Sequence, residues 1–324
     1  MDKKIIKILI YGAGAIGFHL AYLFDVPNVK VYIYMRQKKF EMAMKKGIVI
    51  NIKDNESLLE KCEIKNSEKI KFINKLDNKF KFDYIFFTHK LVENYRSPFK
   101  KVSKYTTDNT FIVTPCTLLP GWWLKKYGIQ KKTIFEKKVI AMTMWISGIM
   151  KDNIVTIKHT QRGYPIEAVY KDGLKASIQL RDLIKKKSIS PKIKNPYSEI
   201  YLKVVNSFAF NLIALKYELN NNGLSKNKKA IIEVKKIMQE IDSLVENLRL
   251  PIDQSIDSRI KQTLSSKKHT MSMLTDFKMN KKVELFNQWR SIKKIKDFSI
   301  KKIENTNNIF QEVKKKIKSN DNII

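Results

Sequence analysis

A glycine motif near the N-terminus has the residue types and the spacing that bind a dinucleotide. Residues 12–17 read GAGAIG and lie between an apolar run at residues 5–11 and a helical pattern at 18–24. Glycines in this pattern permit a sharp turn after a strand, a close approach of pyrophosphate and close packing of the next helix. The first N–H groups of that helix attract phosphate. We expect every residue of the motif to contact the cofactor: Gly12, Ala13, Gly14, Ala15, Ile16 and Gly17.

The residue after the second predicted strand, at 31–35, selects the form of the cofactor. NAD sites usually have Asp or Glu at this point, to bind the ribose 2′-hydroxyl. This chain has Arg36 instead. A cation favours a 2′-phosphate, and so we expect NADP(H). Lys90 follows the predicted buried strand at 84–88. It should face the same cleft, because ligands lie beyond the carboxyl ends of parallel strands.

The apolar segment at residues 5–24 is long enough to suggest a membrane span or a signal peptide. Three glycines at fixed spacing, together with Lys7 and His19, interrupt it. A buried strand, a turn and a helix therefore explain it better, and we expect no membrane partner.

The net charge of +33, from 64 Lys and Arg against 31 Asp and Glu, raises the possibility of a nucleic-acid partner. However, the lysines recur in nearly every segment, and neither an RNP-like nor a zinc-finger pattern is present. We attribute most of the excess to composition and expect no specific nucleic-acid partner. The two cysteines, Cys62 and Cys116, have no CxxC spacing, and the four histidines are scattered. This pattern predicts a cytoplasmic protein with no metal site.

The order of predicted elements indicates an α/β domain followed by an all-α domain. Strands alternate with helices in the first part, as in a Rossmann-type doubly wound sheet. We place the NADP-binding domain at residues 1–190 and an α-helical substrate domain at 191–324, with substrate held between them. Further strands are expected at 47–52, 70–73, 110–114 and 138–144, with short edge strands at 154–159 and 166–170 and a helix at 176–185. Helices are expected at 199–219, 228–248, 252–264, 281–295 and 303–317.

At five places, spread over nearly its whole length, the chain resembles the ketopantoate reductases (2-dehydropantoate 2-reductases). These places are the glycine motif, Arg36, Lys90, residues 201–203 (YLK) followed by Asn211, and residues 269–276 (HTMSMLTD) followed by Glu284. The resemblance implies a C-terminal domain like that of 6-phosphogluconate dehydrogenase. It also implies reduction of ketopantoate to pantoate, with hydride from NADPH.

The resemblance also assigns roles to residues in the second half of the chain. Lys203 is implied as the catalytic general acid, whose ammonium stabilises the forming alkoxide and donates a proton to it. Ser207 and Asn211 lie four and eight residues later, on the same helix face, and are implied to bind substrate with Ser272. Glu284 is implied to orient substrate or cofactor hydroxyls. The alternatives are a solvated Lys203, a capping Ser272 and an ion-paired Glu284.

Two departures from the family pattern affect the substrate site. Ser207 stands where the family usually has Asn. Residues 115–123 read PCTLLPGWW where the family has an Asn-Gly loop that meets nicotinamide and substrate. Cys116 stands near the position of that asparagine, and we expect it to line the cofactor pocket rather than act as a nucleophile. Trp122 and Trp123 are expected to be core or interface residues.

Other functions fit parts of this pattern. An opine-type dehydrogenase, or another NADP enzyme for a 2-oxo acid or an imine, would share the layout. A protein that binds NADP without catalysis would share the glycine motif. The expected assembly is a monomer or a homodimer that takes a small-molecule 2-oxo acid.

Overall fold

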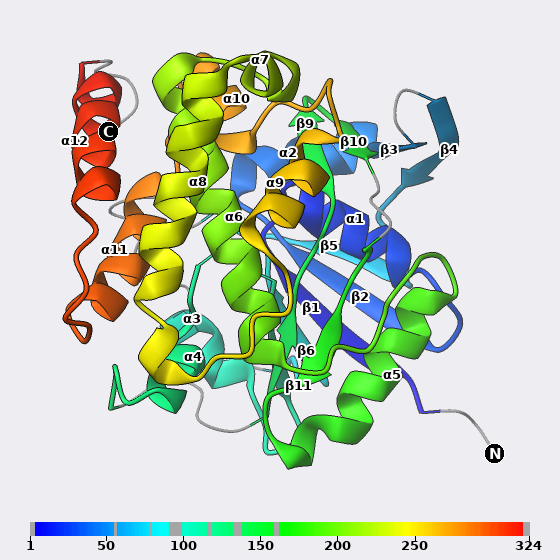
Figure 1. The fold of residues 1–324 in the computed structure, drawn as a ribbon. Helices are drawn as coiled ribbons and strands as arrows, with labels where there is room; N and C mark the ends of the chain where they lie inside the picture. The colour runs from blue at the N-terminus through cyan, green and yellow to red at the C-terminus, as the bar shows by residue number, and fades with distance from the viewer. Residues whose placement is uncertain are drawn as a thin grey trace. The chain divides into compact units, whose positions relative to one another are not determined.

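The chain folds into two compact units in the computed structural model, which describes residues 4–54, 57–77, 79–90, 99–115, 118–131, 138–158 and 162–319. Among these, the first unit holds the residues up to 115 and those from 138 to 196. The second holds residues 118–131 and 197–319 (Figure 1). The expected domains met at 190/191. Along the chain, the boundary between the units falls between Pro196 and Tyr197, and a second segment of the helical unit comes from the middle of the chain.

The main sheet of the first unit has the Rossmann-type order predicted from the sequence. Within the described residues its order is β11-β8-β7-β6-β1-β2-β5, and every pair is parallel except β11 with β8. The order reverses between β1 and β6, which is where a doubly wound sheet binds its ligand. The strands are β1 (Ile6–Tyr11), β2 (Val29–Tyr34), β5 (Ile70–Ile73), β6 (Tyr84–Phe87), β7 (Phe111–Thr114), β8 (Val139–Met142) and β11 (Ile166–Ala168).

Successive residues of a strand point to opposite faces of the sheet, and here helices cover both faces. Ile8 and Ile10 of β1 belong to the core shared with α1 and α5. Leu9 and Tyr11 belong to a second core, shared with α3 and the 3-10 turn η1. The helical elements of this unit are α1 (Ala15–Leu23), α2 (Gln37–Lys46), α3 (Phe99–Val102), η1 (Ser103–Tyr105), η2 (Lys171–Gly173) and α5 (Leu174–Lys185).

A second sheet, ordered β4-β3-β10-β9, packs against α1. It consists of β3 (Ile48–Asp54), β4 (Ser57–Ile64), β9 (Ser147–Lys151) and β10 (Ile154–Lys158). The prediction of an edge strand at 154–159 is therefore wrong, since β10 lies between β3 and β9; residue 159 is outside the described residues. Strand β4 was not predicted, because most of its side chains are exposed and show no apolar alternation.

The position of α1 between the two sheets explains its apolar sequence. Eight of its nine residues are buried. Ile50 and Ile157 of the second sheet join the same core as Phe18. A helix that is apolar on all sides must be enclosed by protein or by lipid, and here protein encloses it. No helix in the described ranges is long and apolar enough to span a bilayer.

The second unit is all-α, as predicted. Its longest helix, α6, buries 16 of its 22 residues and forms the centre of the unit (Figure 1). Because α6 is covered on most sides, it carries apolar residues on nearly every face. The helical elements are α4 (Gly121–Lys126), α6 (Pro196–Tyr217), α7 (Asn221–Lys226), α8 (Lys228–Ser243), η3 (Glu246–Leu248), α9 (Ile256–Leu264), α10 (Ser272–Lys278), α11 (Leu285–Lys296) and α12 (Glu304–Lys318).

The segment that departs from the family pattern contributes α4 to this helical unit. Trp122 and Trp123 are 3% and 0% exposed, so they are core residues, as expected. The indole of Trp123 stacks on Tyr201 with ring centroids 6.2 Å apart, and its Nε1 donates to the carbonyl of Tyr197 at 2.9 Å. The hydrogen bond satisfies the one polar atom of the buried indole. Both contacts fix α4 to the first turns of α6.

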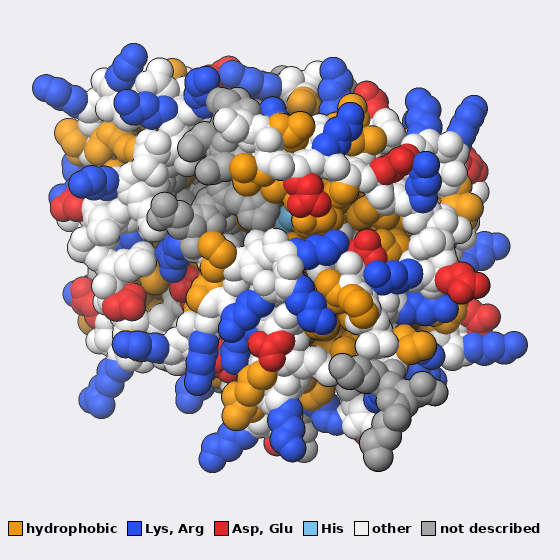
Figure 2. All heavy atoms as spheres, turned by 90° about the vertical axis from the view of Figure 1, so that its right-hand side faces the viewer, with side chains coloured by type: hydrophobic (Ala, Val, Ile, Leu, Met, Phe, Trp, Pro, Cys, Tyr) orange, Lys and Arg blue, Asp and Glu red, His pale blue; other side chains and the backbone are white. Residues whose placement is uncertain are grey.

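Charged side chains on the face shown in Figure 2 are dispersed. Lys and Arg project around its whole outline, with Asp, Glu and apolar side chains between them. A nucleic-acid site would gather its cations on one face or along one groove. This face carries no such concentration among the side chains that are described.

A buried ion pair connects α9 with α8, and its loss should destabilise the second unit. Arg259 is 1% exposed and pairs with Asp242, which also accepts a hydrogen bond from Tyr201 at 3.0 Å. Replacing Arg259 by Met leaves the carboxylate without its cation, which should cost about 3 kcal/mol of unfolding free energy. Urea denaturation followed by circular dichroism measures this. The exposed Lys261→Met on the same helix is the control, and adding Asp242→Leu to Arg259→Met should recover part of the loss. Equal stability of Arg259→Met and wild type would contradict the prediction.

Candidate functional site

The predicted site residues fall into two groups, one in each unit, and each group has its own geometry. The glycine motif, Arg36 and Lys90 belong to the first unit. Lys203, Ser207, Asn211, Ser272 and Glu284 belong to the second. Cys116 was predicted to line the cofactor pocket, and it lies outside the described residues.

The turn between β1 and α1 requires glycine for two steric reasons. Gly12 has φ +131°, and a Cβ atom there would lie 2.5 Å from the backbone nitrogen of His89. A Cβ atom on Gly17 would lie 1.9 Å from the carbonyl oxygen of Gly12. Neither side chain can be accommodated without moving backbone. Thr88 adds a further constraint, since its Oγ1 donates to the same Gly12 oxygen at 2.7 Å.

Gly14 is different, because open space surrounds it. A Cβ atom at Gly14 would meet nothing within 4 Å. Gly14 is the N-cap of α1, where no side chain caps the helix, and the first turn holds no acidic residue. The first N–H groups of the helix are thus left to a ligand, and the helix dipole favours a negative one. This turn can hold the pyrophosphate of a dinucleotide.

Two cations lie beside this turn at the ends of the strands that flank β1. Arg36 follows β2 and is the N-cap of α2. Its side chain is exposed, and its guanidinium has no partner among the described residues. Lys90 is also exposed and comes three residues after the end of β6. Since β2 and β6 are the neighbours of β1, both residues belong to the carboxyl edge that carries the glycine turn.

His89 lies next to Lys90 at this edge, and its pKa is shifted. Its ring packs edge-on against Tyr11, with centroids 5.8 Å apart, and against Phe87 at 6.0 Å. Burial lowers the pKa of His89 to about 4. The ring is therefore neutral above about pH 5, and the positive charge at this edge comes from Arg36 and Lys90.

In the second unit, a polar row runs along one face of α6. Lys203, Ser207 and Asn211 follow one another at four-residue intervals, which places them on successive turns. Lys203 and Ser207 are partly exposed, whereas Asn211 is 3% exposed. Their neighbours Val204, Phe208 and Leu212 are buried in the apolar core of the unit.

Asn211 connects this row with Ser272. Its Oδ1 accepts from the backbone nitrogen of Met273 at 3.0 Å, and its Nδ2 donates to the carbonyl oxygen of Ser207 at 2.6 Å. Ser272 is the first residue of α10 and is exposed. The amide therefore fixes the start of α10 next to α6, and the structure brings Ser207, Asn211 and Ser272 together although more than 60 residues separate the two segments.

Gln288 is a residue of this group that the sequence analysis missed. It is 1% exposed on α11, and its Nε2 donates to Oγ of Ser207 at 3.1 Å. Glu284 precedes α11 as its N-cap, and the backbone nitrogen of Gln288 donates to its carbonyl oxygen at 3.1 Å. The four-residue interval from Glu284 to Gln288 could have identified Gln288 from the sequence, because residues at this interval share a helix face. Through Gln288, α11 brings Glu284 to the polar row of α6.

The two groups differ in what they can do chemically. The first offers backbone N–H donors and two cations, which suit a phosphate-rich ligand. The second offers an ammonium group, two hydroxyls and a carboxylate, which suit proton transfer and the binding of a small polar molecule. Within the described ranges, no three His, Cys, Asp or Glu side chains gather where they could hold a metal ion.

Known proteins resemble this chain in sequence over residues 8–164 and in fold over nearly its whole length. The family model "Ketopantoate reductase PanE/ApbA" matches residues 8–164. No curated protein matches the chain in sequence. A putative ketopantoate reductase from Ralstonia solanacearum MolK2 has a similar structure, with a TM-score of 0.80 and 12% identity over 98% of this chain and 99% of that one.

Two further structures share the fold. D-mandelate dehydrogenase, in a ternary complex with NADH and anilino(oxo)acetate, has a TM-score of 0.80 and 16% identity over 98% of this chain and 100% of that one. A dimeric ketopantoate reductase from Staphylococcus aureus has a TM-score of 0.66 and 14% identity over 97% of this chain and 100% of that one.

Two glycine variants should separate ligand binding from folding. Gly14→Ala has room for its methyl group and an extended backbone, so it should fold normally and yet weaken dinucleotide binding at least tenfold. Gly17→Ala forces its methyl group onto the Gly12 oxygen and should lose about 3 kcal/mol of stability. Thermal unfolding and NADPH titration measure the two effects. A Gly14→Ala protein that binds NADPH as wild type does would remove the turn from the site.

The lowered pKa of His89 predicts a loss of stability in acid. In the unfolded chain His takes up a proton near pH 6.5, and in the folded chain only near pH 4. The unfolded state therefore binds more protons between these values, and the stability present above pH 6.5 falls as the pH is lowered. Between pH 7 and pH 4.5, wild type should lose up to about 2 kcal/mol more than His89→Gln. Urea denaturation at both pH values tests this, and parallel losses in the two proteins would contradict it.

Proposed function

We propose that this chain, a divergent member of the ketopantoate reductase family of NADP-dependent oxidoreductases, reduces a small 2-oxo acid with hydride from NADPH. The observation that carries the proposal is the polar row of α6, in which Lys203, Ser207 and Asn211 share one face of a helix whose residues are mostly apolar and buried. A buried helix has no reason to carry such a row unless the row meets a polar ligand or positions a group that does. In this chain Asn211 positions α10, and so it supports Ser272.

The residues of the second unit supply the proton side of the reaction. NADPH, when bound, provides the hydride. The ammonium of Lys203 stabilises the negative charge that develops on the substrate oxygen and then gives that oxygen a proton. Ser207 and Ser272 donate hydrogen bonds to the carboxylate or the hydroxyl of the substrate. Glu284 accepts hydrogen bonds from cofactor hydroxyls.

The residues of the first unit hold the cofactor. The N–H groups of the turn at residues 12–17 bind the pyrophosphate. Arg36 binds the 2′-phosphate, which accounts for a cation where NAD enzymes usually carry an acid. Lys90 adds positive charge at the same edge.

The substrate proposed first is ketopantoate, which would place the enzyme in pantothenate biosynthesis. The likeness to D-mandelate dehydrogenase supports a second candidate, a 2-oxo acid with an aromatic side chain, because that enzyme was captured with the aromatic oxo acid anilino(oxo)acetate. Both candidates share a carboxylate next to a carbonyl group. A cytoplasmic location and a monomeric or homodimeric assembly are part of the same proposal.

A turnover assay distinguishes these possibilities. NADPH oxidation is followed with ketopantoate, with 2-oxo-2-phenylacetate, and with each of them plus an amino acid. Turnover that requires the amino acid would indicate the opine-type reaction. NADPH binding without turnover on any oxo acid would indicate a non-catalytic NADP-binding protein.

Replacing Lys203 by Ala should remove the general acid. We expect kcat to fall at least a hundredfold, because general acid catalysis typically contributes about 10²–10⁴. The Kd for NADPH should stay within about twofold, since the cofactor phosphates are held by the other unit. Lys261→Ala, an exposed lysine of the same unit, is the matched control. Wild-type turnover in Lys203→Ala would exclude Lys203 as the acid.

A further inference from the structure

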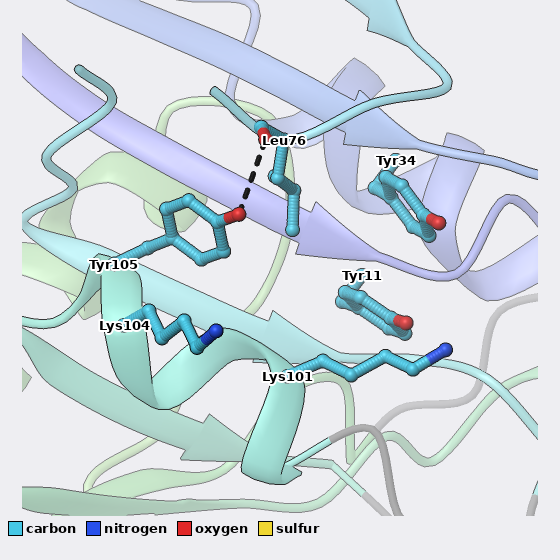
Figure 3. Close-up of a pocket in the computed structure, with 6 residues that line it drawn as sticks. All are labelled: Tyr11, Tyr34, Leu76, Lys101, Lys104 and Tyr105. Atoms are coloured by element: carbon cyan, nitrogen blue, oxygen red, sulfur yellow. Dashed lines mark hydrogen bonds between the residues drawn. The ribbon is translucent and has the colours of Figure 1, made fainter. Parts of the chain in front are cut away.

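Figure 3 shows a cavity of about 410 Å³ in the first unit, lined by side chains that include Tyr11, Tyr34 and Tyr105. It lies at the edge of the sheet that carries the glycine turn, and the proposed cofactor accounts for it. The polar row of α6 belongs to the second unit. Its central residue, Ser207, has a hydroxyl group that can donate a hydrogen bond to a ligand or accept one, and the surrounding side chains decide which.

Two amide side chains converge on the hydroxyl of Ser207 from different helices. Nδ2 of Asn211, one turn later on α6, donates to Oγ of Ser207 at 3.2 Å. Nε2 of Gln288, on α11, donates to the same oxygen at 3.1 Å. A serine oxygen has two lone pairs that can accept. The two amides therefore occupy both acceptor positions of the Ser207 hydroxyl.

The backbone fixes the orientation of the Asn211 amide. Its Oδ1 accepts from the backbone nitrogen of Met273 at 3.0 Å, and a backbone N–H can only donate. Its Nδ2 also donates to the carbonyl oxygen of Ser207 at 2.6 Å, and a carbonyl oxygen can only accept. Two independent contacts thus require the nitrogen of this amide, rather than its oxygen, to face Ser207.

The packing of α11 against α6 holds Gln288 in place. Gln288 is 1% exposed. The next residue, Trp289, stacks on Phe208 of α6 with ring centroids 5.9 Å apart, and on Phe310 of α12 at 4.5 Å. Phe208 directly follows Ser207 in the sequence. Because close packing leaves a buried side chain few alternative rotamers, the Gln288 amide is confined next to the Ser207 hydroxyl.

The hydrogen of the Ser207 hydroxyl is left for a ligand. No described residue accepts a hydrogen bond from it, and this includes the carbonyl of Lys203, although a helical serine often donates to the carbonyl four residues earlier. Ser207 is partly exposed, so a ligand can reach the hydrogen. Since both lone pairs are already used, Ser207 can donate to that ligand but cannot accept from it.

We infer that Gln288 is a positioning residue which, together with Asn211, makes Ser207 a dedicated hydrogen-bond donor to a substrate oxygen that only accepts, such as a carboxylate oxygen. The inference rests on the proposed function and adds a residue to it. The ammonium of Lys203, one turn earlier, also has donors and no acceptor. The two partly exposed members of the row therefore match a 2-oxo acid, whose carboxylate and ketone oxygens only accept.

Replacing Gln288 by Met removes one N–H donor from Ser207 and keeps a side chain of similar length. The hydroxyl then has a free lone pair, and its hydrogen is no longer directed to the substrate. KM for the oxo acid should rise about threefold to fivefold. The kcat should stay within about twofold, because Lys203 still supplies the proton. Gln311→Met, at an exposed position on α12, is the matched control and should change neither value.

A double variant shows whether Gln288 acts through Ser207. Ser207→Ala removes the donated hydrogen and should raise KM about tenfold. Adding Gln288→Met to Ser207→Ala should then raise KM no further, because the group that Gln288 positions is already gone. A merely structural effect of Gln288→Met would raise KM by the same factor with and without the Ser207 hydroxyl, and that result overturns the inference.

Steady-state kinetics with ketopantoate and with 2-oxo-2-phenylacetate give KM and kcat. Isothermal titration of the same acids into protein saturated with NADP⁺ gives dissociation constants without turnover. Thermal unfolding checks the fold of each variant. If Gln288→Met does not fold, Ser207→Ala decides, since alanine favours a helix at this partly exposed position, and an unchanged KM in that variant overturns the inference.

The same measurements separate this inference from the proposed function. A wild-type protein that neither binds nor reduces an oxo acid overturns both. A wild-type protein that reduces one of them, while the losses in the two single variants simply multiply in the double variant, overturns only the positioning role of Gln288.

Discussion

Helix α1 starts so close to the end of β1 that the carbonyl oxygen of Gly12 occupies the place of a side chain at Gly17. This approach determines much of the first unit. It leaves the first amides of α1 open beyond the sheet, and it presses a mostly apolar helix, with eight of nine residues buried, against β1. The outer side of that helix must then also be covered, and the second sheet provides Ile50, Ile52, Val155 and Ile157 for this purpose. The binding turn and the extra sheet are thus consequences of one packing constraint.

The second unit meets a different requirement, the placement of polar groups on a helix that forms the core. Buried amides are costly without hydrogen bonds, and here they form bonds that join elements far apart in the chain. Asn211 links α6 to α10, and Gln288 links α11 to Ser207. These bonds satisfy both polar atoms of the Asn211 amide and the Nε2 of Gln288, and they also fix the segments that carry Ser272 and Glu284. The polar row therefore helps to organise the unit.

The large positive charge can favour an anionic ligand at a small number of positions. Arg36 has no acidic partner among the described residues, and it belongs to the edge of the sheet at which the glycine turn lies. Other cations are paired, such as Lys216, which contacts Glu233 at 3.2 Å and Glu312 at 2.9 Å. Unpaired cations raise the local potential and favour capture of an anionic ligand. The remaining excess is dispersed over the surface.

The sequence by itself determined the features that depend on neighbouring residues. The GAGAIG turn, the cation at Arg36 and the helical second part follow from local spacing, and the polar row of α6 follows from a four-residue period. Strand β4 was missed because its side chains are mostly exposed, and α4 because short helices leave a weak pattern. The hydrogen bonds from Gln288 to Ser207 and from Met273 to Asn211 required the tertiary structure. Their residues come from separate segments, and only the order of strands and the packing of helices decides which distant side chains meet.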